Sequence, residues 1–340
     1  MKKSGYFFIV ICTLLLTGCK SQSYVNETDV TEQKIQMGFS IDSFVIERWQ
    51  RDRDVFVSTA NELGAEVNVQ NANGNVEEQK AQIEYFIDKK MDVIVVIAVD
   101  SEACRDVLKK ASDAGIKIVA YDRLLRNTNA DLYISFDNEE VGRLMAETLK
   151  KELSSGGNII TIFGPTTDNN VQQVESGFNE VISESKLNVI YSVYAKGWLA
   201  EEAFEAINDC LSLDQKINGV MCGNDDLASQ AVRALSENRM AGKVIVTGQD
   251  ADLAACQRIV EGTQTMTVYK PVDKLAKSAA EYAVKLGKGE DIEAVTTIND
   301  GSYNVPYIKL EPIGVTKENI DKIIIQGGFH QKEDVYLNIP

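Results

Sequence analysis

The feature that most constrains the fold is a regular alternation of short apolar runs with longer segments of helical spacing. In segment 44–63, for example, Trp49, Val55, Phe56, Ala60 and Leu63 recur at helical intervals. Each apolar run is followed by a segment long enough to cross over the sheet, which predicts parallel strands with right-handed connections. The runs expected to form these first strands are 34–41, 65–70, 92–99 and 116–121.

The second half of the chain repeats this organisation. In the first half, the run 92–99 is apolar on both faces, as a central parallel strand is. The alternation of strands and helices then restarts after a break at 154–157. A length of 340 residues fits two domains. The expected fold class is therefore α/β, with two doubly wound, Rossmann-like parallel sheets. Strands of the second half are expected at 158–163, 189–193, 217–222, 243–247 and 265–268.

The N-terminus has the pattern of a secretory signal. Lys2 and Lys3 precede an apolar stretch, 5–16, of about a dozen residues, whereas a membrane span needs about 20. The block Leu16-Thr17-Gly18-Cys19 resembles a bacterial lipobox, which implies a lipoprotein signal peptide at 1–18 and lipidation of Cys19. An uncleaved short anchor, or an ordinary signal with a chance cysteine, remains the alternative. Residues 19–33 are polar and lack periodicity, so they are expected to form a flexible tether.

Composition excludes several classes of function. The net charge of −16 opposes binding to a nucleic acid backbone, which needs clustered Lys and Arg. His330 is the single histidine, and neither common glycine-rich phosphate motif occurs, so no metal or cofactor is expected. The chain offers binding groups without an evident nucleophile. The isolated cysteines are expected to be buried free thiols, and they are Cys104, Cys210, Cys222 and Cys256.

Polar side chains follow several of the expected strands directly. Asp122 and Arg123 end one run, and Asn224, Asp250 and Lys270 follow three others. Ligands of open α/β sheets bind at the carboxyl ends of the strands. Carboxylates accept hydrogen bonds from hydroxyl groups, whereas Arg and Lys donate them. We therefore expect these strand ends to meet around one polar small molecule, although each group also has a purely structural alternative.

Those alternatives are specific. Asp122 and Arg123 could form a surface ion pair, and Asn224 could be only a helix cap. Of the next acidic pair, Asp250 is the expected ligand and Asp252 the expected cap. In the run Asp168-Asn169-Asn170, one residue should cap a helix while another faces the ligand.

The two tryptophans occupy comparable places in the two halves. Trp49 follows Arg48 at the start of the first helix, and Trp198 follows the second strand of the second half. Aromatic rings stack on the apolar faces of sugar rings, so a pair of indoles on opposite walls would enclose a pyranose. Core packing at a helix start is the alternative for either ring.

The chain resembles the periplasmic sugar-binding proteins of ABC importers, which have the type I fold. Together the matching segments span nearly all of the chain after the tether, and 248–253 and 262–271 are the most specific. The segments are 47–54, 70–75, 120–123, 133–139, 168–170, 197–199, 224–225, 248–253, 262–271 and 328–330.

This resemblance implies two lobes joined by a three-strand hinge, with a sugar held in the cleft between them. The crossings are expected near 136–138, 268–269 and 298–299. The first lobe would comprise 34–137 and 270–297, and the second 138–269 and 298–340. By resemblance, the sugar would be bound by Arg48, Trp49, Asp122, Arg123, Asn169, Trp198, Asn224, Asp250 and Lys270.

The resemblance also implies a function. The segments are nearest to family members that bind D-xylose, so we expect closure on a monosaccharide, D-xylose, and its delivery to an ABC permease. The protein would be lipid-anchored on the extracytoplasmic face of a bacterial membrane. Some relatives instead signal through a membrane histidine kinase, which is the main alternative for the partner.

Two other classes share some of these features. A sugar-responsive transcription regulator has the same fold, but it would need an N-terminal DNA-binding motif and a basic face. A glycosidase could use pairs of aspartates. Neither fits a chain that begins with a signal pattern and has an acidic surface with few reactive groups, so we expect no enzyme activity.

Overall fold

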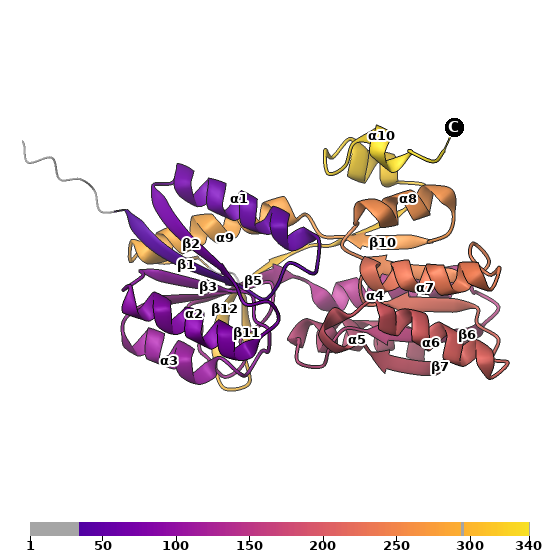
Figure 1. The fold of residues 1–340 in the computed structure, drawn as a ribbon, viewed down its shortest axis with the longest axis horizontal. Coiled ribbons are helices and arrows are strands. Elements are labelled where there is room, and N and C mark those ends of the chain that lie inside the picture. The colour runs from indigo at the N-terminus through magenta and orange to yellow at the C-terminus, as the bar shows by residue number, and fades with distance from the viewer. Residues whose placement is uncertain (1–33, 294–295, 340) are drawn as a thin grey trace, which may run out of the picture. The chain divides into compact units, whose positions relative to one another are not determined.

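The structure is a computed structural model, and it describes residues 34–293 and 296–339. The described residues form one compact unit. Within it, the strands form two sheets, whose orders are β11-β12-β5-β4-β3-β1-β2 and β13-β10-β9-β8-β6-β7 (Figure 1). We call each sheet with its covering helices the first and the second lobe. The signal, lipidation and tether predictions, which concern 1–33, lie outside the described residues.

The first sheet is mainly parallel and is buried on both faces. Met37 of β1 lies opposite Val67 of β2 and Val93 of β3, so β1 is a central strand. In β3, Val93 and Val95 join one apolar cluster, while Ile94 and Val96 join the other. Successive side chains of one strand therefore pack against helices on opposite faces of the sheet. The strands are β1 (Ile35–Ile41), β2 (Ala65–Asn71), β3 (Val93–Val96), β4 (Lys117–Tyr121), β5 (Leu132–Phe136), β11 (Thr296–Asn299) and β12 (Asn304–Leu310).

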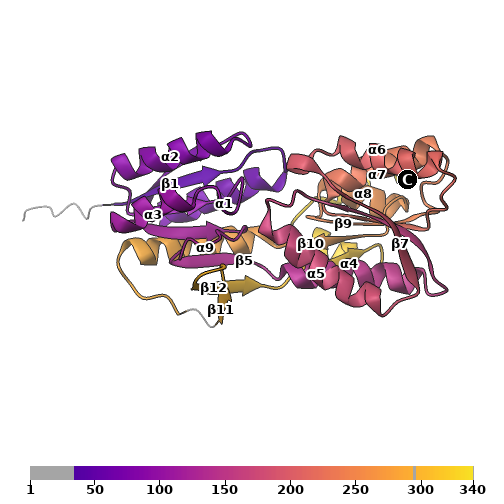
Figure 2. The ribbon, with the colours of Figure 1, turned by 90° about the horizontal axis from the view of Figure 1, so that it is seen from below.

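Four helices cover this sheet. Helices α1 (Arg48–Glu62) and α9 (Val272–Gly287) pack together, and α2 (Val76–Asp88) and α3 (Arg105–Asp113) form a second pair (Figures 1 and 2). Asn75 caps α2, because its side chain accepts hydrogen bonds from the N–H groups of Glu77 and Glu78. Helix α1 begins at Arg48, four residues later than expected.

The second sheet has the same layered construction. Helices α4 (Asn138–Glu152) and α5 (Asn169–Ser183) pack on each other, as do α6 (Glu201–Ser212) and α7 (Asp225–Glu237) (Figure 2). Strand β6 lies between β7 and β8 in parallel register. The strands are β6 (Gly157–Phe163), β7 (Leu187–Tyr194), β8 (Gly219–Cys222), β9 (Ile245–Gln249), β10 (Met266–Tyr269) and β13 (Ile313–Thr316).

The chain passes between the lobes at three places. Strand β5 leads into α4 at 137, and β10 leads into α9 at 270–271, close to the expected positions. The third expected crossing, at 298–299, is wrong. Those residues lie in β11, which forms a hairpin with β12, and β12 pairs with β5 of the first sheet. The chain returns to the second sheet only after Leu310, where β13 pairs with β10.

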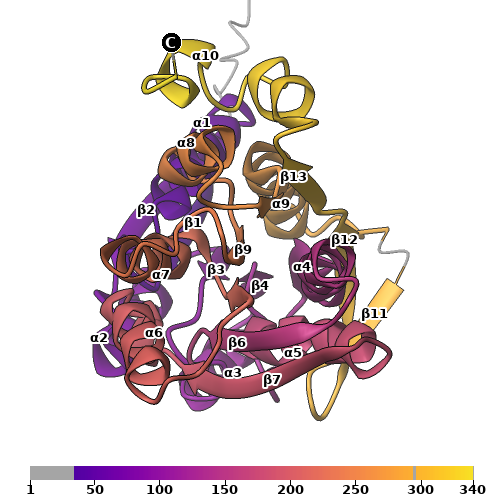
Figure 3. The same ribbon diagram turned by 90° about the vertical axis from the view of Figure 1, so that its right-hand side faces the viewer.

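The C-terminal segment packs on the second lobe. It contains a π-helical turn (Asp321–Ile325) and α10 (Lys332–Val335), and α10 contacts α8 (Leu253–Glu261) (Figures 1 and 3). Ile320, Ile324 and Val335 are buried in this contact. In the part of the chain that the structure describes, no helix has the length and apolar character needed to cross a bilayer.

Candidate functional site

A pocket lies where strand ends of both lobes meet. The empty space among its lining atoms amounts to about 460 Å³, which includes open solvent. The pocket is lined by Ile46, Arg48, Trp49, Asp122, Arg123, Asn138, Phe163, Gly164, Asp168, Asn170, Val171, Val174, Trp198, Gly223, Asn224, Gln249, Asp250 and Lys270. These residues come from segments separated by up to two thirds of the chain, and the parallel strands bring them together at their carboxyl ends.

Arg48 is fixed at the first residue of α1. Its Nε and one terminal nitrogen donate to the two oxygens of Asp52, at 3.2 and 3.0 Å, and Tyr121 donates to the same carboxylate. The other terminal nitrogen lies 2.9 Å from Asp122 and 3.9 Å from Asp250 of the second lobe. Burial alone would lower the pKa of Arg48, but Asp122 and Asp52 raise it well above its usual value. The guanidinium therefore stays charged in a buried site.

Asp122 directly follows β4 and has a left-handed backbone, with φ of 61°. Such a conformation is unusual for a residue with a side chain, although Asp tolerates it better than most. Burial opposes ionisation of its carboxyl, but Arg48, Lys270 and Arg123 hold the pKa of Asp122 below its usual value. The site thus contains a buried carboxylate that is ionised at neutral pH and can accept hydrogen bonds from hydroxyl groups.

Arg123 links elements of both lobes. One terminal nitrogen donates to Asp42 at 2.6 Å and to the carbonyl oxygen of Ala98 at 2.7 Å. Its Nε lies 2.8 Å from Asp168 of the second lobe. The remaining terminal nitrogen, Nη2, is buried and has no hydrogen-bond partner among the described residues. Arg123 therefore has a fixed position and one donor left over.

The start of α5 provides the facing wall. Asp168 caps this helix by accepting from the N–H of Asn170, and it also lines the pocket. The Asn170 amide donates to the carbonyl and to the carboxylate of Asp122, at 3.1 and 2.9 Å. Asn169, the residue expected to bind the sugar, does not line the pocket. Its oxygen accepts from Arg126 at 3.1 Å, outside the pocket.

The other second-lobe groups come from the ends of β8, β9 and β10. Asn224 caps α7 by accepting from Leu227 N at 2.9 Å, and it lines the pocket as well. Asn224 can therefore cap the helix and face a ligand at the same time. Lys270 lies 2.8 Å from Asp250. Asp252 stands at the start of α8, but its side chain makes no capping hydrogen bond, contrary to expectation.

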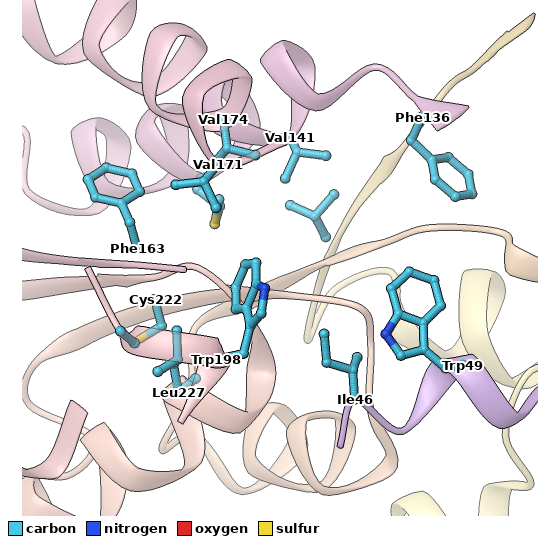
Figure 4. Packing of buried hydrophobic residues seen from close by; sticks show 14 of the residues in the cluster. Ile46, Trp49, Phe136, Val141, Phe163, Val171, Val174, Trp198, Cys222 and Leu227 are labelled. Atoms are coloured by element: carbon cyan, nitrogen blue, oxygen red, sulfur yellow. The ribbon is translucent and has the colours of Figure 1, made fainter. Parts of the chain in front are cut away.

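Both tryptophans line the pocket and are buried, with exposed fractions of 2% for Trp49 and 9% for Trp198. The Arg48 guanidinium lies 4.4 Å from the centre of the Trp49 ring. The Trp198 ring rests on Gly164, where an added Cβ would collide with it, and on Gly223, where an added Cβ would lie 3.2 Å from it. Each indole Nε1 is buried without a hydrogen-bond partner among the described residues. Figure 4 shows both rings in one apolar cluster, with Ile46 between them in this view.

Sequence reasoning missed part of the pocket lining. Asp168 and Asn170 were in a segment recognised as important, but nothing in the sequence said which residue of the three faces inward. Asn138 and Gln249 each follow or end a strand, which is the same signal that identified Asp122. The apolar residues Ile46, Phe163, Val171 and Val174 could not be told from ordinary core residues.

The chemistry available in the pocket is that of binding. It has fixed Arg and Lys donors, Asp and Asn acceptors, and apolar rings, which together suit a small polyhydroxy compound. The described residues, 34–293 and 296–339, contain no cluster of three or more His, Cys, Asp or Glu that could hold a metal. His330 does not line the pocket, and its Nε2 lies 2.8 Å from the carbonyl oxygen of Ala251. The four cysteines in the described part are buried and free, as expected.

Two doubly wound lobes, joined by three crossings and enclosing a polar pocket, define a periplasmic binding protein of type I fold. Residues 37–291 match the periplasmic binding protein domain family, and this chain belongs to that family. The fold class and the family expected from the sequence are thereby confirmed.

The chain is similar in sequence to two D-xylose-binding periplasmic proteins. The chain is 44% identical over 307 residues to the D-xylose-binding periplasmic protein of Haemophilus influenzae, covering 89% of this chain and 92% of that protein. It is 42% identical over 330 residues to the D-xylose-binding periplasmic protein of Escherichia coli K12, covering 96% and 99%.

A solved structure supports the same family. The carbohydrate transporter solute-binding protein of Chloroflexus aurantiacus, in complex with D-glucose, superposes with a TM-score of 0.81. It is 26% identical, and the match covers 88% of this chain and 98% of that one. The lobes described above therefore have the architecture of a carbohydrate-binding protein.

Proposed function

We propose that this chain is an extracytoplasmic lipoprotein that closes on a monosaccharide, D-xylose, and delivers it to an ABC transporter. The observation that carries the proposal is the pocket itself. It places two buried indoles and fixed Arg, Asp and Asn side chains from both lobes around one small space. The identity of 42–44% with two D-xylose-binding relatives supports the choice of sugar.

Each group in the pocket has a role in this proposal. Trp49 and Trp198 stack on the two apolar faces of the pyranose, and their free Nε1 groups donate to hydroxyls at the ring edge. Arg123 donates its remaining terminal nitrogen, and Asp122 accepts from a hydroxyl. The proposed ligand set has Asn170 in place of Asn169 and adds Asp168, so it comprises Arg48, Trp49, Asp122, Arg123, Asp168, Asn170, Trp198, Asn224, Asp250 and Lys270.

Isothermal titration calorimetry tests the choice of sugar. The purified chain without residues 1–18 is titrated with D-xylose, L-arabinose, D-ribose, D-glucose and D-galactose. We expect saturable binding of D-xylose, with weaker or no binding of the hexoses. An absence of D-xylose binding at millimolar concentration contradicts the proposal, and tighter binding of another sugar corrects the substrate.

The lipid anchor is the second part of the proposal. It rests on the lipobox-like block Leu16-Thr17-Gly18-Cys19, which is followed by 14 mostly polar residues before Lys34. A Cys19→Ser variant should lose radiolabelled palmitate and move from the membrane fraction to the soluble fraction. A variant that stays in the membrane fraction argues for an uncleaved anchor instead.

The membrane partner is the third part. Similarity to a solved structure that is named as an ABC transporter solute-binding protein supports a permease. Affinity purification of the tagged, anchored protein from detergent-solubilised membranes, with D-xylose present, distinguishes the two candidates. Recovery of permease and ATPase subunits supports delivery for transport, whereas recovery of a histidine kinase shows that the chain is a sensing subunit.

Binding is proposed to occur without chemical change. The acidic groups of the pocket are engaged by Arg, Lys or Asn, and none is paired with an evident nucleophile. Incubation with D-xylose and with a chromogenic xyloside should leave both unaltered. Turnover of the xyloside that disappears in Asp122→Asn would instead show a glycosidase.

A further inference from the structure

A second set of contacts joins the lobes beside the sugar pocket. The N–H of Ser101, which follows β3 in the first lobe, donates to the carbonyl oxygen of Thr167 in the second lobe at 3.1 Å. The guanidinium of Arg126, in the loop between β4 and β5, donates to the Asn169 oxygen at 3.1 Å. None of these four residues lines the pocket.

The two contacts are mechanically linked on the first lobe. The backbone N–H of Arg126 donates to the carbonyl oxygen of Ser101 at 2.7 Å, so both contact residues belong to one joined pair of loops. The neighbouring Asn127 N–H donates to the carbonyl of Asp300, which ties the loop to the β11–β12 hairpin. Arg126 is therefore presented from a braced loop, with its Nε 3.4 Å from Glu102.

On the second lobe, the same short segment faces both the pocket and this contact. Asp168 and Asn170 face the pocket and meet Arg123 and Asp122, while Thr167 and Asn169 alternate with them and meet the first lobe. Fixing Asn169 thus fixes the two pocket residues on either side of it.

We propose that Arg126 and Asn169, with the Ser101–Thr167 backbone bond, form a clasp that sets sugar affinity without touching the sugar. The inference rests on the proposed function, since it concerns the affinity of that site. The clasp bonds exist only when the lobes are together, so they favour the conformation in which Asp168 and Asn170 complete the pocket. Apparent affinity falls in proportion to the population of the binding-competent conformation.

The clasp makes Asn169 and Arg126 positioning residues. Loss of one charge-assisted hydrogen bond should raise the dissociation constant for D-xylose by about fivefold. The effect should appear in the dissociation rate, because opening becomes easier while the open pocket is unchanged. A direct sugar ligand would also change the relative affinities for different pentoses, whereas clasp residues should weaken all sugars by the same factor.

The test compares Arg126→Ala, Arg126→Lys, Asn169→Ala and the double variant Arg126→Ala/Asn169→Ala with wild type. Arg105→Ala is the matched control, since Arg105 is an exposed first-lobe arginine paired with its neighbour Asp106. Calorimetry gives the dissociation constants for D-xylose and one weaker pentose. Stopped-flow fluorescence of the pocket tryptophans gives the rates, and circular dichroism checks folding.

The expected result is a weaker affinity in both single alanine variants, partial recovery in Arg126→Lys, and no further loss in the double variant. Arg105→Ala should match wild type. If the alanine variants bind and release D-xylose like wild type, the clasp proposal is wrong, whereas the proposed function is unaffected. A changed order of preference among pentoses also overturns the clasp proposal, by showing Asn169 to be a direct ligand. A wild-type protein that binds no sugar overturns the proposed function together with the clasp.

Discussion

At the residue scale, the charged groups of the pocket hold one another in position. Asp52, which lies behind Arg48 and is fully buried, receives hydrogen bonds from Arg48 and from Tyr121. Asp42 likewise accepts a hydrogen bond from Arg123 and holds it in position. A guanidinium that already has a fixed partner loses little conformational freedom when a ligand binds, which favours affinity. The buried ion pairs of this site are therefore better explained by ligand binding than by a contribution to the stability of the fold.

The first prediction concerns the groups proposed to contact the sugar. Trp198→Ala and Arg123→Ala should each weaken D-xylose binding at least tenfold, about 1.4 kcal/mol, because buried Trp and Arg anchors dominate binding energies. Calorimetry measures the affinity, and circular dichroism confirms the fold. Unchanged affinity in both variants would contradict the assignment of the pocket as the sugar site.

The second prediction concerns Asp52. Asp52→Asn removes one of the two buried carboxylates that pair with Arg48 and leaves Asp122 in place. The free energy of unfolding should therefore fall by up to about 3 kcal/mol, the cost of breaking a buried ion pair. D-Xylose affinity should also fall, because Arg48 is held less firmly. Urea denaturation measures the first effect and calorimetry the second. Asp54→Asn, on the exposed side of α1, is the control and should change neither.

The sequence allowed some of these residues to be found and hid others. Asp122, Arg123, Asp250 and Lys270 could be predicted to lie at the site because each directly follows a strand. Asp52 could not, because its partner Tyr121 is 69 positions away and only the fold brings them together. The choice between Asn169 and Asn170 depends on the backbone direction at the start of α5, which residue type alone does not specify.

At the element scale, the ends of strands and helices determine the shape of the pocket. Gly164 follows β6 and Gly223 follows β8, and the Trp198 ring lies against both. Glycine at these strand ends gives the indole room to lie flat against the backbone. The ring position is therefore a property of the strand ends as much as of Trp198 itself.

The third prediction follows from this packing. Gly164→Ala places a methyl group where the Trp198 ring lies, so the ring must move and D-xylose affinity should fall at least tenfold. The control is Gly314→Ala in β13, where the nearest atom to the new Cβ is 3.6 Å away. Calorimetry on both variants measures the difference. Equal affinities would show that the Trp198 ring does not need its present position.

The fourth prediction concerns the carboxyl of Asp225, which follows β8 and forms hydrogen bonds with residues at the start of β10. Asp225 accepts from Gln264 at 2.8 Å and from Thr267 at 2.7 Å. Burial raises its pKa to about 7, while Arg258 opposes the shift and nearby Asp250 adds to it. An unfolded Asp has a pKa near 3.9, so between about pH 4 and 7 the folded state keeps a proton that the unfolded state has released.

Stability should therefore fall as the pH rises through that window. Asp225→Asn cannot titrate, so its free energy of unfolding should decline less between pH 5 and 7, by on the order of 1 kcal/mol or more. Urea denaturation at several pH values measures both proteins. Parallel pH profiles for wild type and variant would contradict the raised pKa.

Element prediction was accurate where the pattern is local and wrong where pairing is distant. The alternation of strands and helices predicted both parallel sheets. The third crossing was misplaced because β11 and β12 form a hairpin that adds to the edge of the first sheet. Tyr307 of β12 lies opposite Tyr133 of β5, and no short-range pattern reports such a pairing.

At the scale of the whole molecule, the residues that line the pocket come from both lobes and from one of the crossings. Arg48 approaches Asp250, Arg123 pairs with Asp168, and Asn170 bonds to Asp122, so each wall orders the other. A sugar that contacts both walls would favour the conformation in which the lobes are together. Ligand recognition and lobe closure are then one event, which is what a transporter or sensor in the membrane can detect.

The most direct measurement of this account is a crystal structure of the protein grown with D-xylose. We predict a single pyranose between Trp49 and Trp198, hydrogen-bonded to Asp122 and Arg123 of the first lobe and to Asn170 or Asp250 of the second. Asn169 should remain bonded to Arg126 rather than to the sugar. A pocket without sugar at saturating D-xylose, or a pyranose bound by one lobe only, would contradict the account.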